Sequence, residues 1–332
     1  MPVARRFVVV VLALVLAACS HGTPAASGPS PSPSASETPG SPAGSITSPP
    51  SSSKAGAPKK APSAGILRFS RVIVVVMENK EYGSIIGSSK APYINSLASR
   101  YSLATQFYAA THPSLPNYLA LTGGSTFGIT SDCTDCHVNA PNIVTQLEGA
   151  GISWKAYNEG LPSPCSNAAT SGTYAKKHNP FMYFDDITSN PARCSKVVPM
   201  TQLDTDLTSG NLPSFVWVTP DLCHDMHDCS VTEGDHWLSS FLPPLLKSLD
   251  SHGVLFLTWD EGSTGAGCCT YASGGHIPAI VAGPAARANT TSATAYDHYS
   301  LLRTIEVSWN LGMLGNAACS CSPDMRALVN RA

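Results

Sequence analysis

Three unbroken apolar runs constrain the fold of this chain more than any other feature of its sequence. Residues 72–77 read VIVVVM, residues 215–218 read FVWV and residues 254–258 read VLFLT. A strand that is apolar at every position is covered on both faces, which is typical of a parallel sheet between two layers of helices. We therefore predict a buried strand at each run, and a fourth at residues 276–282 (HIPAIVA).

Helical stretches separate these runs. Residues 142–150 end before a glycine, residues 236–250 are interrupted by two prolines, and residues 296–309 have an apolar face at helical spacing. Strands that alternate with helices predict a three-layer α/β/α domain with a mainly parallel central sheet. The middle of the chain, residues 130–214, is rich in Cys, Pro, Asn and Gly, and we expect a loop-heavy lobe over one edge of the sheet.

The amino terminus has the pattern of an export signal. Arg5 and Arg6 precede the apolar stretch FVVVVLALVLAA, which is too short to be a permanent membrane span. The stretch ends in Leu-Ala-Ala-Cys, which resembles the bacterial lipobox, where the cysteine is lipidated. We therefore predict a lipoprotein signal peptide at residues 1–18, with Cys19 anchoring the protein to the extracytoplasmic face of the cell membrane. The alternative is ordinary cleavage after Ala18.

Two further segments follow the signal. Residues 19–66 are almost entirely Ser, Pro, Gly, Ala and Thr, and such a segment cannot bury enough apolar area to offset the entropy of ordering it. We predict a disordered tether there and a catalytic domain at residues 67–332. The net charge of the chain is only −2, so we expect no nucleic-acid partner.

Ten cysteines remain when Cys19 is set aside from the eleven in the chain. An even number in an exported protein predicts up to five disulfides, whose pairing the sequence does not fix. Cys133 with Cys136, and Cys223 with Cys229, are close enough in sequence to pair, although such pairs also occur in zinc knuckles and other metal sites. A histidine follows the first pair and completes the CxxCH pattern of haem attachment, which we disfavour because the motif occurs once among many other cysteines.

Polar side chains directly follow three of the apolar runs. Glu78 and Asn79 follow the first, Asp260 and Glu261 follow the third, and the second leads into TPDLCHDMHDC at residues 219–229. In open α/β sheets the ligand site lies beyond the carboxyl ends of the strands. A single strand often ends in a polar turn residue, but three strands that each deliver acid, amide or imidazole groups indicate one shared site.

The chemistry of these groups indicates a divalent metal ion. Carboxylates and amide oxygens are hard ligands that suit Mg²⁺, Ca²⁺ or Mn²⁺ and are also acceptable to Zn²⁺. Without a cation, carboxylates so close together would repel one another and some would be protonated. The histidines of the loop could hold a phosphoryl oxygen or protonate a leaving group.

A candidate nucleophile lies in THPSLPNYLALTGG, residues 111–124. Ser114 would be at or near the start of a helix, with Pro116 just inside the first turn. Backbone N–H groups at a helix start stabilise an alkoxide and attract phosphate, and a metal ion can activate a serine hydroxyl. Taken alone, Ser114 fits a plain N-cap serine better than a nucleophile, because N-cap serines are very common.

Five segments together resemble the bacterial phosphoesterase family of acid phosphatases and phospholipases C, within the alkaline-phosphatase-like superfamily. In order between Arg71 and Gly315, they are VIVVVMENKEYGSIIG, THPSLPNYLALTGG, TPDLCHDMHDC, TWDEG and GGHIPAIVAGP. The resemblance implies an alkaline-phosphatase-like fold. Sulfatases of that superfamily need CxPxR, whereas CSPDMR at residues 321–326 has its arginine displaced by one. Motifs of serine esterases, zincins and P-loop proteins are absent from the sequence.

The resemblance also implies roles for individual residues. The implied metal ligands all carry oxygen: Glu78, Asn79, Ser114, Asp260 and Glu261. The groups implied to bind phosphate or assist the leaving group are the histidines His224, His227 and His276. Ser114 would be the nucleophile, and Asn117 would contact the phosphate or support the Ser114 turn. Asp221 occupies a position where relatives with two metals place a ligand.

These observations predict an exported, metal-dependent, acid-phosphatase-like hydrolase that acts on a phosphoester small molecule or lipid headgroup. Ser114 would form a phosphoserine, and His224 or His276 would protonate the departing alcohol. Within enzymes, the alternative is a phospholipase C or phosphodiesterase. From another class, the alternative is a non-catalytic lipoprotein that binds a metal or solute.

Overall fold

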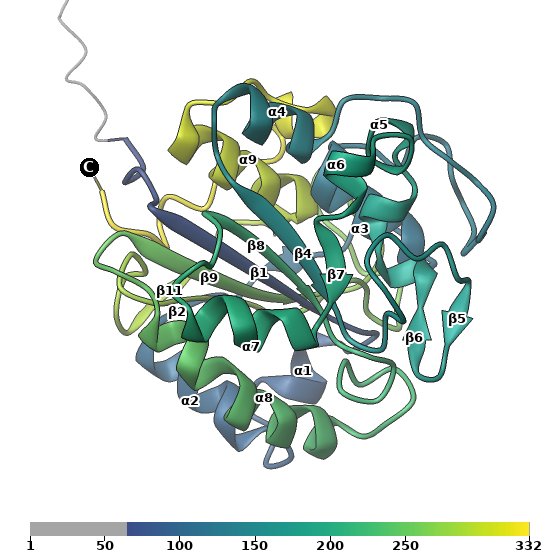
Figure 1. The fold of residues 1–332 in the computed structure, drawn as a ribbon. Coiled ribbons are helices and arrows are strands. Elements are labelled where there is room, and N and C mark those ends of the chain that lie inside the picture. Colours follow the sequence, from purple (N-terminus) through teal and green to yellow (C-terminus); the bar gives the residue numbers. More distant parts are fainter. Residues whose placement is uncertain (1–64, 332) are drawn as a thin grey trace, which may run out of the picture. The chain divides into compact units, whose positions relative to one another are not determined.

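The computed structural model describes residues 65–331, and its centre is an eight-stranded sheet in the order β11-β2-β10-β9-β1-β8-β4-β7 (Figure 1). Its strands are β1 (Arg71–Met77), β2 (Ser102–Ala104), β4 (Trp154–Asn158), β7 (Val197–Pro199), β8 (Phe215–Thr219), β9 (Gly253–Trp259), β10 (Ala279–Ala282) and β11 (Thr290–Ser292). The predicted signal peptide, residues 1–18, and all but the end of the predicted tether lie outside the described residues. Ile66, at that end, is buried and pairs with Arg331.

The sheet is mainly parallel, as predicted. Strands β9, β1, β8, β4 and β7 all run in the same direction. Only β10 is reversed, because it pairs antiparallel with both β9 and β2. Two small two-stranded sheets lie outside it, formed by β3 (Phe107–Tyr108) with β12 (Tyr296–Asp297), and by β5 (Thr170–Ser171) with β6 (Tyr174–Ala175).

Helices cover both faces of the sheet, which confirms the three-layer α/β/α prediction (Figure 1). One face carries α2 (Pro92–Arg100), α7 (Thr201–Thr208) and α8 (Val231–Lys247), and the other carries α3 (Ser114–Gly123), α4 (Ile143–Gly149) and α9 (His298–Trp309). The short helices are α1 (Tyr82–Ile85), α5 (Asp185–Thr188), α6 (Pro191–Cys194), η1 (Lys176–His178), η2 (Pro180–Met182) and η3 (Gly315–Ala318). Within residues 65–331, we find no helix with the length and apolar character needed to cross a bilayer.

The prolines predicted to interrupt a helix lie inside α8 instead. This helix begins after Ser230, whose hydroxyl accepts a hydrogen bond from the Glu233 N–H (3.2 Å), and continues through Pro243 and Pro244. A proline inside a helix leaves the carbonyl four residues earlier without its usual donor. Both prolines lie on the exposed face of α8, where water can satisfy those carbonyls.

The expectation for residues 130–214 was wrong in part, because this segment contributes two strands to the central sheet. Strand β4 pairs with β8, and β7 is the edge strand next to it. The β4 sequence WKAYN contains Lys155, whose Nζ forms an ion pair with Asp206 (2.6 Å), so it lacks the apolar run that marks the other central strands. Helices α4 and α7 of this segment lie on opposite faces of the sheet, and the short helices α5 and α6 and the β5–β6 pair lie beyond β7 (Figure 1).

The ten cysteines after Cys19 form five disulfides. Both predicted pairs are present, so the CxxCH segment is a disulfide loop. The pairs are Cys133–Cys136, Cys165–Cys194, Cys223–Cys229, Cys268–Cys269 and Cys319–Cys321.

A buried carboxyl group in α9 leads to a prediction about stability. Glu306 is fully buried, and although its Oε1 accepts a hydrogen bond from the Leu314 N–H (2.9 Å), burial raises its pKa to about 7. Because the folded chain favours the protonated form of Glu306, this group contributes stability at pH values below its pKa in the unfolded chain. That stability is lost as pH rises through its folded-state pKa of about 7. As pH rises from 5 to 8, the free energy of unfolding of Glu306→Gln should therefore increase relative to that of wild type, by on the order of 2 kcal/mol. Urea unfolding at each pH measures this difference.

A matched control for this prediction is Glu148→Gln. Despite the opposing effect of burial, hydrogen bonds from Trp154, Lys196 and Arg193 lower the pKa of Glu148 to about 2. Its charged form therefore contributes stability above the unfolded pKa, and Glu148→Gln should lose stability at pH 8. A pH-independent difference between Glu306→Gln and wild type would contradict the assignment.

Candidate active site

Three predicted residues from separate segments meet beyond the carboxyl ends of β1 and β9. Glu78 directly follows β1, Glu261 is the second residue after β9, and Ser114 is the first residue of α3. The Ser114 hydroxyl lies 3.2 Å from Glu78 Oε2 and 3.4 Å from Glu261 Oε1. Because β1 and β9 are parallel neighbours, the residues that follow them reach the same edge of the sheet.

Asp260 and Asn79 complete this group. Asp260 is fully buried, and its Oδ1 accepts hydrogen bonds from the backbone N–H groups of Asn79 (3.0 Å) and Glu261 (2.6 Å). Its Oδ2 is buried without a hydrogen-bond partner among the described residues. The Asn79 side chain donates to Glu78 Oε2 (3.1 Å). Together with Glu78, Ser114 and Glu261, these residues are called the carboxylate group below.

The electrostatics of the carboxylate group call for a cation. Burial is the main cause that raises the pKa of Glu78, followed by the charges of Asp260 and Asp225. Burial also raises the pKa of Asp260, and burial and the Asp260 charge raise the pKa of Glu261 to about 7. The charged forms are unfavourable unless a positive charge compensates them. The three carboxylates, the amide and the hydroxyl are therefore a donor set that fits a divalent cation. The Asp260 oxygen that has no partner among the described residues agrees with this.

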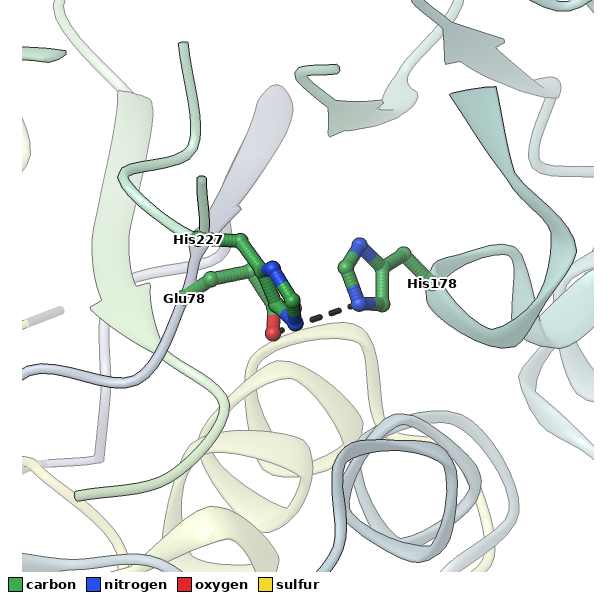
Figure 2. A group of neighbouring side chains, drawn as sticks. All are labelled: Glu78, His178 and His227. Carbon is green, nitrogen blue, oxygen red and sulfur yellow. Dashed lines mark ion pairs between the residues drawn. The ribbon is translucent and has the colours of Figure 1, made fainter. Parts of the chain in front are cut away.

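Two histidines, His178 and His227, lie beside Glu78 (Figure 2). His178 Nε2 lies 3.3 Å from Glu78 Oε2, and its Nδ1 lies 3.2 Å from Asp225 Oδ2. Ligand atoms of Glu78, His178 and His227 all lie within 4.8 Å of one another. Burial lowers the pKa of His178 to about 3 and raises the pKa of Asp225 to about 8. His178 is therefore a neutral imidazole between two buried carboxyl groups.

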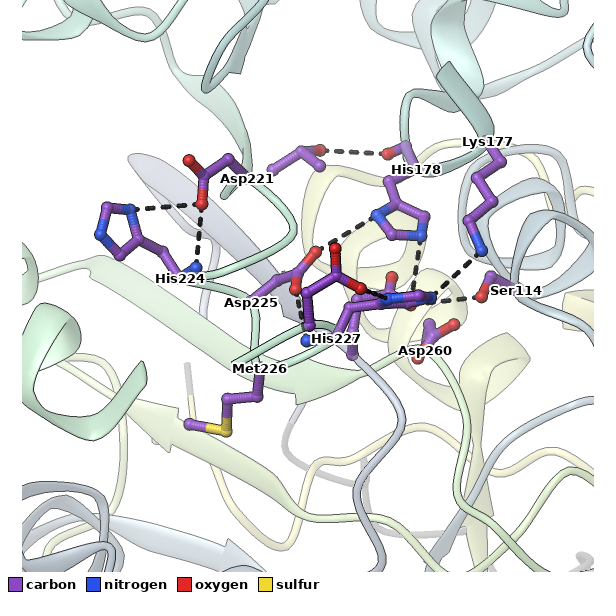
Figure 3. Close-up of polar contacts among 12 residues, drawn as sticks. Ser114, Lys177, His178, Asp221, His224, Asp225, Met226, His227 and Asp260 are labelled. Atoms are coloured by element: carbon purple, nitrogen blue, oxygen red, sulfur yellow. Dashed lines mark hydrogen bonds and ion pairs between the residues drawn. The ribbon is translucent and has the colours of Figure 1, made fainter. Parts of the chain in front are cut away.

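His227 is joined to a lysine (Figure 3). Lys177 Nζ lies 3.3 Å from His227 Nε2 and 3.0 Å from Asp132 Oδ2, and His227 Nδ1 lies 2.7 Å from Asp228 Oδ1. Because an ammonium group only donates, His227 Nε2 accepts and Nδ1 carries the proton. The Leu115 N–H, at the start of α3, donates to the other Asp132 oxygen (3.0 Å).

Backbone contacts fix the loop that carries Asp225 and His227. The Glu78 N–H donates to the Asp225 carbonyl (2.8 Å), and Lys80 Nζ donates to the Met226 carbonyl (2.7 Å). Met226 has a left-handed backbone (φ 80°), which is rare for a side chain of this kind. The disulfide between Cys223 and Cys229 closes the same loop. The segment after β1 thus holds this loop in place.

The loop after β9 is fixed from the same segment. Glu81 Oε1 accepts hydrogen bonds from the N–H groups of Ser263 and Thr264, both at 2.9 Å. His112 Nε2 then lies 3.0 Å from the Thr264 carbonyl oxygen, and His112 Nδ1 lies 2.6 Å from Glu261 Oε2. His112 therefore orients the carboxylate of Glu261 toward Ser114.

The sequence of this chain is similar to those of known proteins. Residues 88–312, more than half of the chain, match the profile of the Phosphoesterase family. The chain belongs to the phosphoesterase family. It is 36% identical over 253 residues to the phosphatidylinositol-3-phosphatase of Mycobacterium tuberculosis, covering 75% of this chain and 80% of that protein. It is 32% identical to an acid phosphatase of Aspergillus fumigatus, covering 76% of this chain and 58% of that protein.

Solved structures show the same fold. A Vibrio parahaemolyticus protein of the alkaline phosphatase superfamily aligns with a TM-score of 0.54 at 15% identity, covering 80% of this chain and 72% of that one. A sulfatase from a Pseudoalteromonas species aligns with a TM-score of 0.51 at 12% identity, over 80% and 72% of the two chains. The fold is alkaline-phosphatase-like, and this phosphoesterase is a phosphoric ester hydrolase.

The predicted residues His224 and Asp221 lie elsewhere in this phosphoesterase. His224 Nδ1 is 2.9 Å from Glu159 Oε2 and 3.5 Å from Asp221 Oδ1, and its ring stacks on Trp237. Asp221 also accepts a hydrogen bond from Thr173 Oγ1 (2.6 Å). In the part of the chain that the structure describes, no contact joins either residue to the carboxylate group, and Figure 3 shows both apart from Ser114.

His276 is also held by other contacts. Its ring stacks between Tyr82 and Tyr108, with ring centroids 4.5 and 5.0 Å away, and its Nε2 lies 3.0 Å from the Thr105 carbonyl oxygen. Among residues 65–331, we find no hydrogen bond between His276 and the carboxylate group.

The predicted residue Asn117 lies buried at the base of the Ser114 turn. Its side chain accepts a hydrogen bond from the Thr111 N–H (3.0 Å) and donates to the carbonyls of Thr111 (2.8 Å) and Pro113 (3.1 Å). Of the two roles considered for Asn117, these contacts correspond to support of the turn.

Sequence reasoning did not single out five residues of the site: His112, Tyr118, Lys177, His178 and Asp225. Tyr118 lies four residues after Ser114, on the same helix face; its hydroxyl donates to Glu78 and its ring stacks on His178. That spacing, and the place of Asp225 within TPDLCHDMHDC, were usable signals. Lys177 and His178 lie in a 3-10 turn within an aperiodic segment, so only the folded chain reveals them.

Proposed function

We propose that this chain is an exported, metal-dependent, acid-phosphatase-like enzyme in which Ser114 is the nucleophile and a phosphoserine the intermediate. The observation that carries this proposal is the Ser114 hydroxyl, at the first residue of α3 and within 3.4 Å of two carboxylates that follow separate strands. The relatives named acid phosphatase and phosphatidylinositol-3-phosphatase support a phosphatase activity.

The carboxylate group would hold the metal ion. The residues that would bind it are Glu78, Asn79, Ser114, Asp260 and Glu261. When bound, a divalent cation would polarise a phosphoryl oxygen and favour the ionised serine hydroxyl. The unpartnered Oδ2 of Asp260 and the raised pKa values of the three carboxylates support this assignment. The all-oxygen donor set is consistent with Mg²⁺, Ca²⁺, Mn²⁺ or Zn²⁺.

The chain's own residues would then carry out a two-step displacement. Ser114 Oγ loses its proton to solvent and forms a bond to phosphorus, while the bond between phosphorus and the ester oxygen breaks. Glu78 and Glu261, which Ser114 Oγ contacts, stay ionised as ligands of the cation. Because His224 and His276 are held by other contacts, we assign the proton taken up by the alcohol to solvent. Water then attacks the phosphoserine, which releases phosphate and restores Ser114.

An assay with p-nitrophenyl phosphate tests this function. The purified domain is stripped of metal, and Mg²⁺, Ca²⁺, Mn²⁺ or Zn²⁺ is added back one at a time. We expect release of p-nitrophenol with at least one cation and none after chelation. Absence of turnover with every cation, while the protein stays folded, would contradict the proposal.

The location of the enzyme is a separate proposal, which concerns residues outside the described part. The Leu-Ala-Ala-Cys motif supports lipidation of Cys19 and attachment to the outer face of the cell membrane. The Cys19→Ala variant should be released from the membrane or accumulate as the unprocessed precursor, both detectable by fractionation and immunoblotting. Unchanged processing and membrane retention would refute this proposal, and Cys133→Ala is a control that leaves the motif intact.

A further inference from the structure

Lys177 brings a positive charge to the histidine side of the Ser114 site. Its ammonium group is hydrogen-bonded to His227, which lines the Ser114 site. Among residues 65–331, no other lysine or arginine is hydrogen-bonded to a side chain that lines this site. The neighbouring cations are turned elsewhere, since Lys80 donates to the Met226 carbonyl and Lys176 donates to the Thr134 carbonyl. Figure 3 shows the Lys177 ammonium group beside His227, on the side where Ser114 lies.

The contacts of Lys177 leave it able to bind a further group. An ammonium group has three N–H donors. Asp132 accepts one of them at 3.0 Å and His227 Nε2 accepts a second at 3.3 Å, so the third has no partner among residues 65–331. Burial lowers the pKa of Lys177, but the hydrogen bond and charge of Asp132 outweigh this effect and the pKa lies above its usual value. The side chain therefore keeps its positive charge at all working pH values.

The start of α3 supplies less positive potential than the sequence predicted. The Leu115 N–H is already bonded to Asp132, and Pro116 has no N–H. Two of the first three helix residues are thus unable to donate to a phosphoryl oxygen. A substrate at Ser114 needs another donor on this side, and the free N–H of Lys177 is placed beside it.

The charge of the substrate makes this donor selective. A phosphomonoester carries about −1.5 to −2 charges near pH 7, and a diester has one fewer oxygen that can ionise. A fixed cation opposite the carboxylates therefore favours the monoester.

On the basis of the proposed function, we propose that Lys177 is a specificity-determining residue that makes this enzyme prefer phosphomonoesters to phosphodiesters. Its free N–H donates to a terminal phosphoryl oxygen that a monoester leaves ionised and a diester esterifies. Asp132 positions the ammonium group and links it to the first turn of the nucleophile helix.

The test compares p-nitrophenyl phosphate with methyl p-nitrophenyl phosphate, which share a leaving group and differ by one esterified oxygen. In Lys177→Met, the ratio of kcat/KM for monoester over diester should fall by about tenfold to a hundredfold, the usual effect of losing a charged hydrogen bond. Lys177→Arg should restore most of the ratio. Lys155→Met is the matched control, because Lys155 is also part-buried and paired with an aspartate but lies on β4.

A second measurement does not depend on turnover. Calorimetric titration with inorganic phosphate should show weaker binding by Lys177→Met and unchanged binding by Lys155→Met, with thermal unfolding confirming that both are folded. An unchanged substrate ratio in Lys177→Met, or equal losses for both substrates, would overturn the role of Lys177 while leaving the phosphatase proposal intact. Wild-type protein that hydrolyses neither substrate would instead overturn the proposed function.

Discussion

Ser114→Ala is expected to hydrolyse p-nitrophenyl phosphate at least about ten-thousand-fold more slowly than wild type, because loss of a nucleophile removes the covalent route. The fold should survive. Ser114 is the first helical residue and Pro113 is the N-cap, so the Ser114 hydroxyl is not the cap of α3 and its loss leaves the helix start intact. Its described partners are the carboxylates of Glu78 and Glu261.

Trapping the intermediate separates this role from simple positioning. Acid quenching of wild type with substrate labelled at phosphorus should leave label on the peptide that contains Ser114. Thr122→Ala is a suitable control, since it removes another buried hydroxyl of α3, whose one hydrogen bond within the described part of the chain goes to the Tyr118 carbonyl (2.8 Å). Label on a different residue, or a fully active Ser114→Ala variant, would mean that water attacks directly.

Asp260→Asn should abolish metal binding and lower activity by at least about a thousandfold, an effect expected when a cation site loses a charged ligand. The asparagine keeps an oxygen that can accept from the N–H groups of Asn79 and Glu261, so local structure is retained. What it removes is the charge on a buried carboxyl group whose second oxygen has no described partner. Metal content by mass spectrometry and the shift in Tm on cation addition measure binding without turnover.

The control for this experiment is Asp235→Asn. Asp235 is also buried, but its oxygens accept from the N–H groups of Tyr93 (3.1 Å) and Ile94 (2.8 Å) at the start of α2. This variant should lose stability and keep its metal. If Asp260→Asn bound the cation as tightly as wild type, the metal site would have to be moved to other residues.

The parts of the site that sequence could predict are those attached to long apolar strands. Glu78, Asp260 and Glu261 follow strands whose uniform burial gives a strong signal, so parallel pairing brings them together. Helix α3 was recognisable from the Ser-Leu-Pro-Asn start and the Gly124 end.

The remaining parts depend on contacts between segments with weak local patterns. His178 reaches Glu78 from a three-residue turn, and nothing in its neighbourhood distinguishes it from a surface histidine. His224 and His276 lie in motifs that suggested a catalytic role, but both rings pack against aromatic side chains instead. The His224 ring stacks on Trp237. The His276 ring stacks between Tyr82 and Tyr108. The spacing of residues in a motif does not reveal which aromatic side chain a histidine will contact. Only the folded structure therefore shows that these two imidazoles lie away from the carboxylate group.

The segment from Glu78 to Glu81 contacts both loops that surround the site, the loop after β8 and the loop after β9. Lys80 donates a hydrogen bond to the Met226 carbonyl in the loop that carries His227. Glu81 accepts hydrogen bonds from the Ser263 and Thr264 N–H groups in the loop that carries Glu261. Both sets of contacts come from the same four residues, 78–81. A change in the backbone of this one segment should therefore displace the loop after β8 and the loop after β9 together.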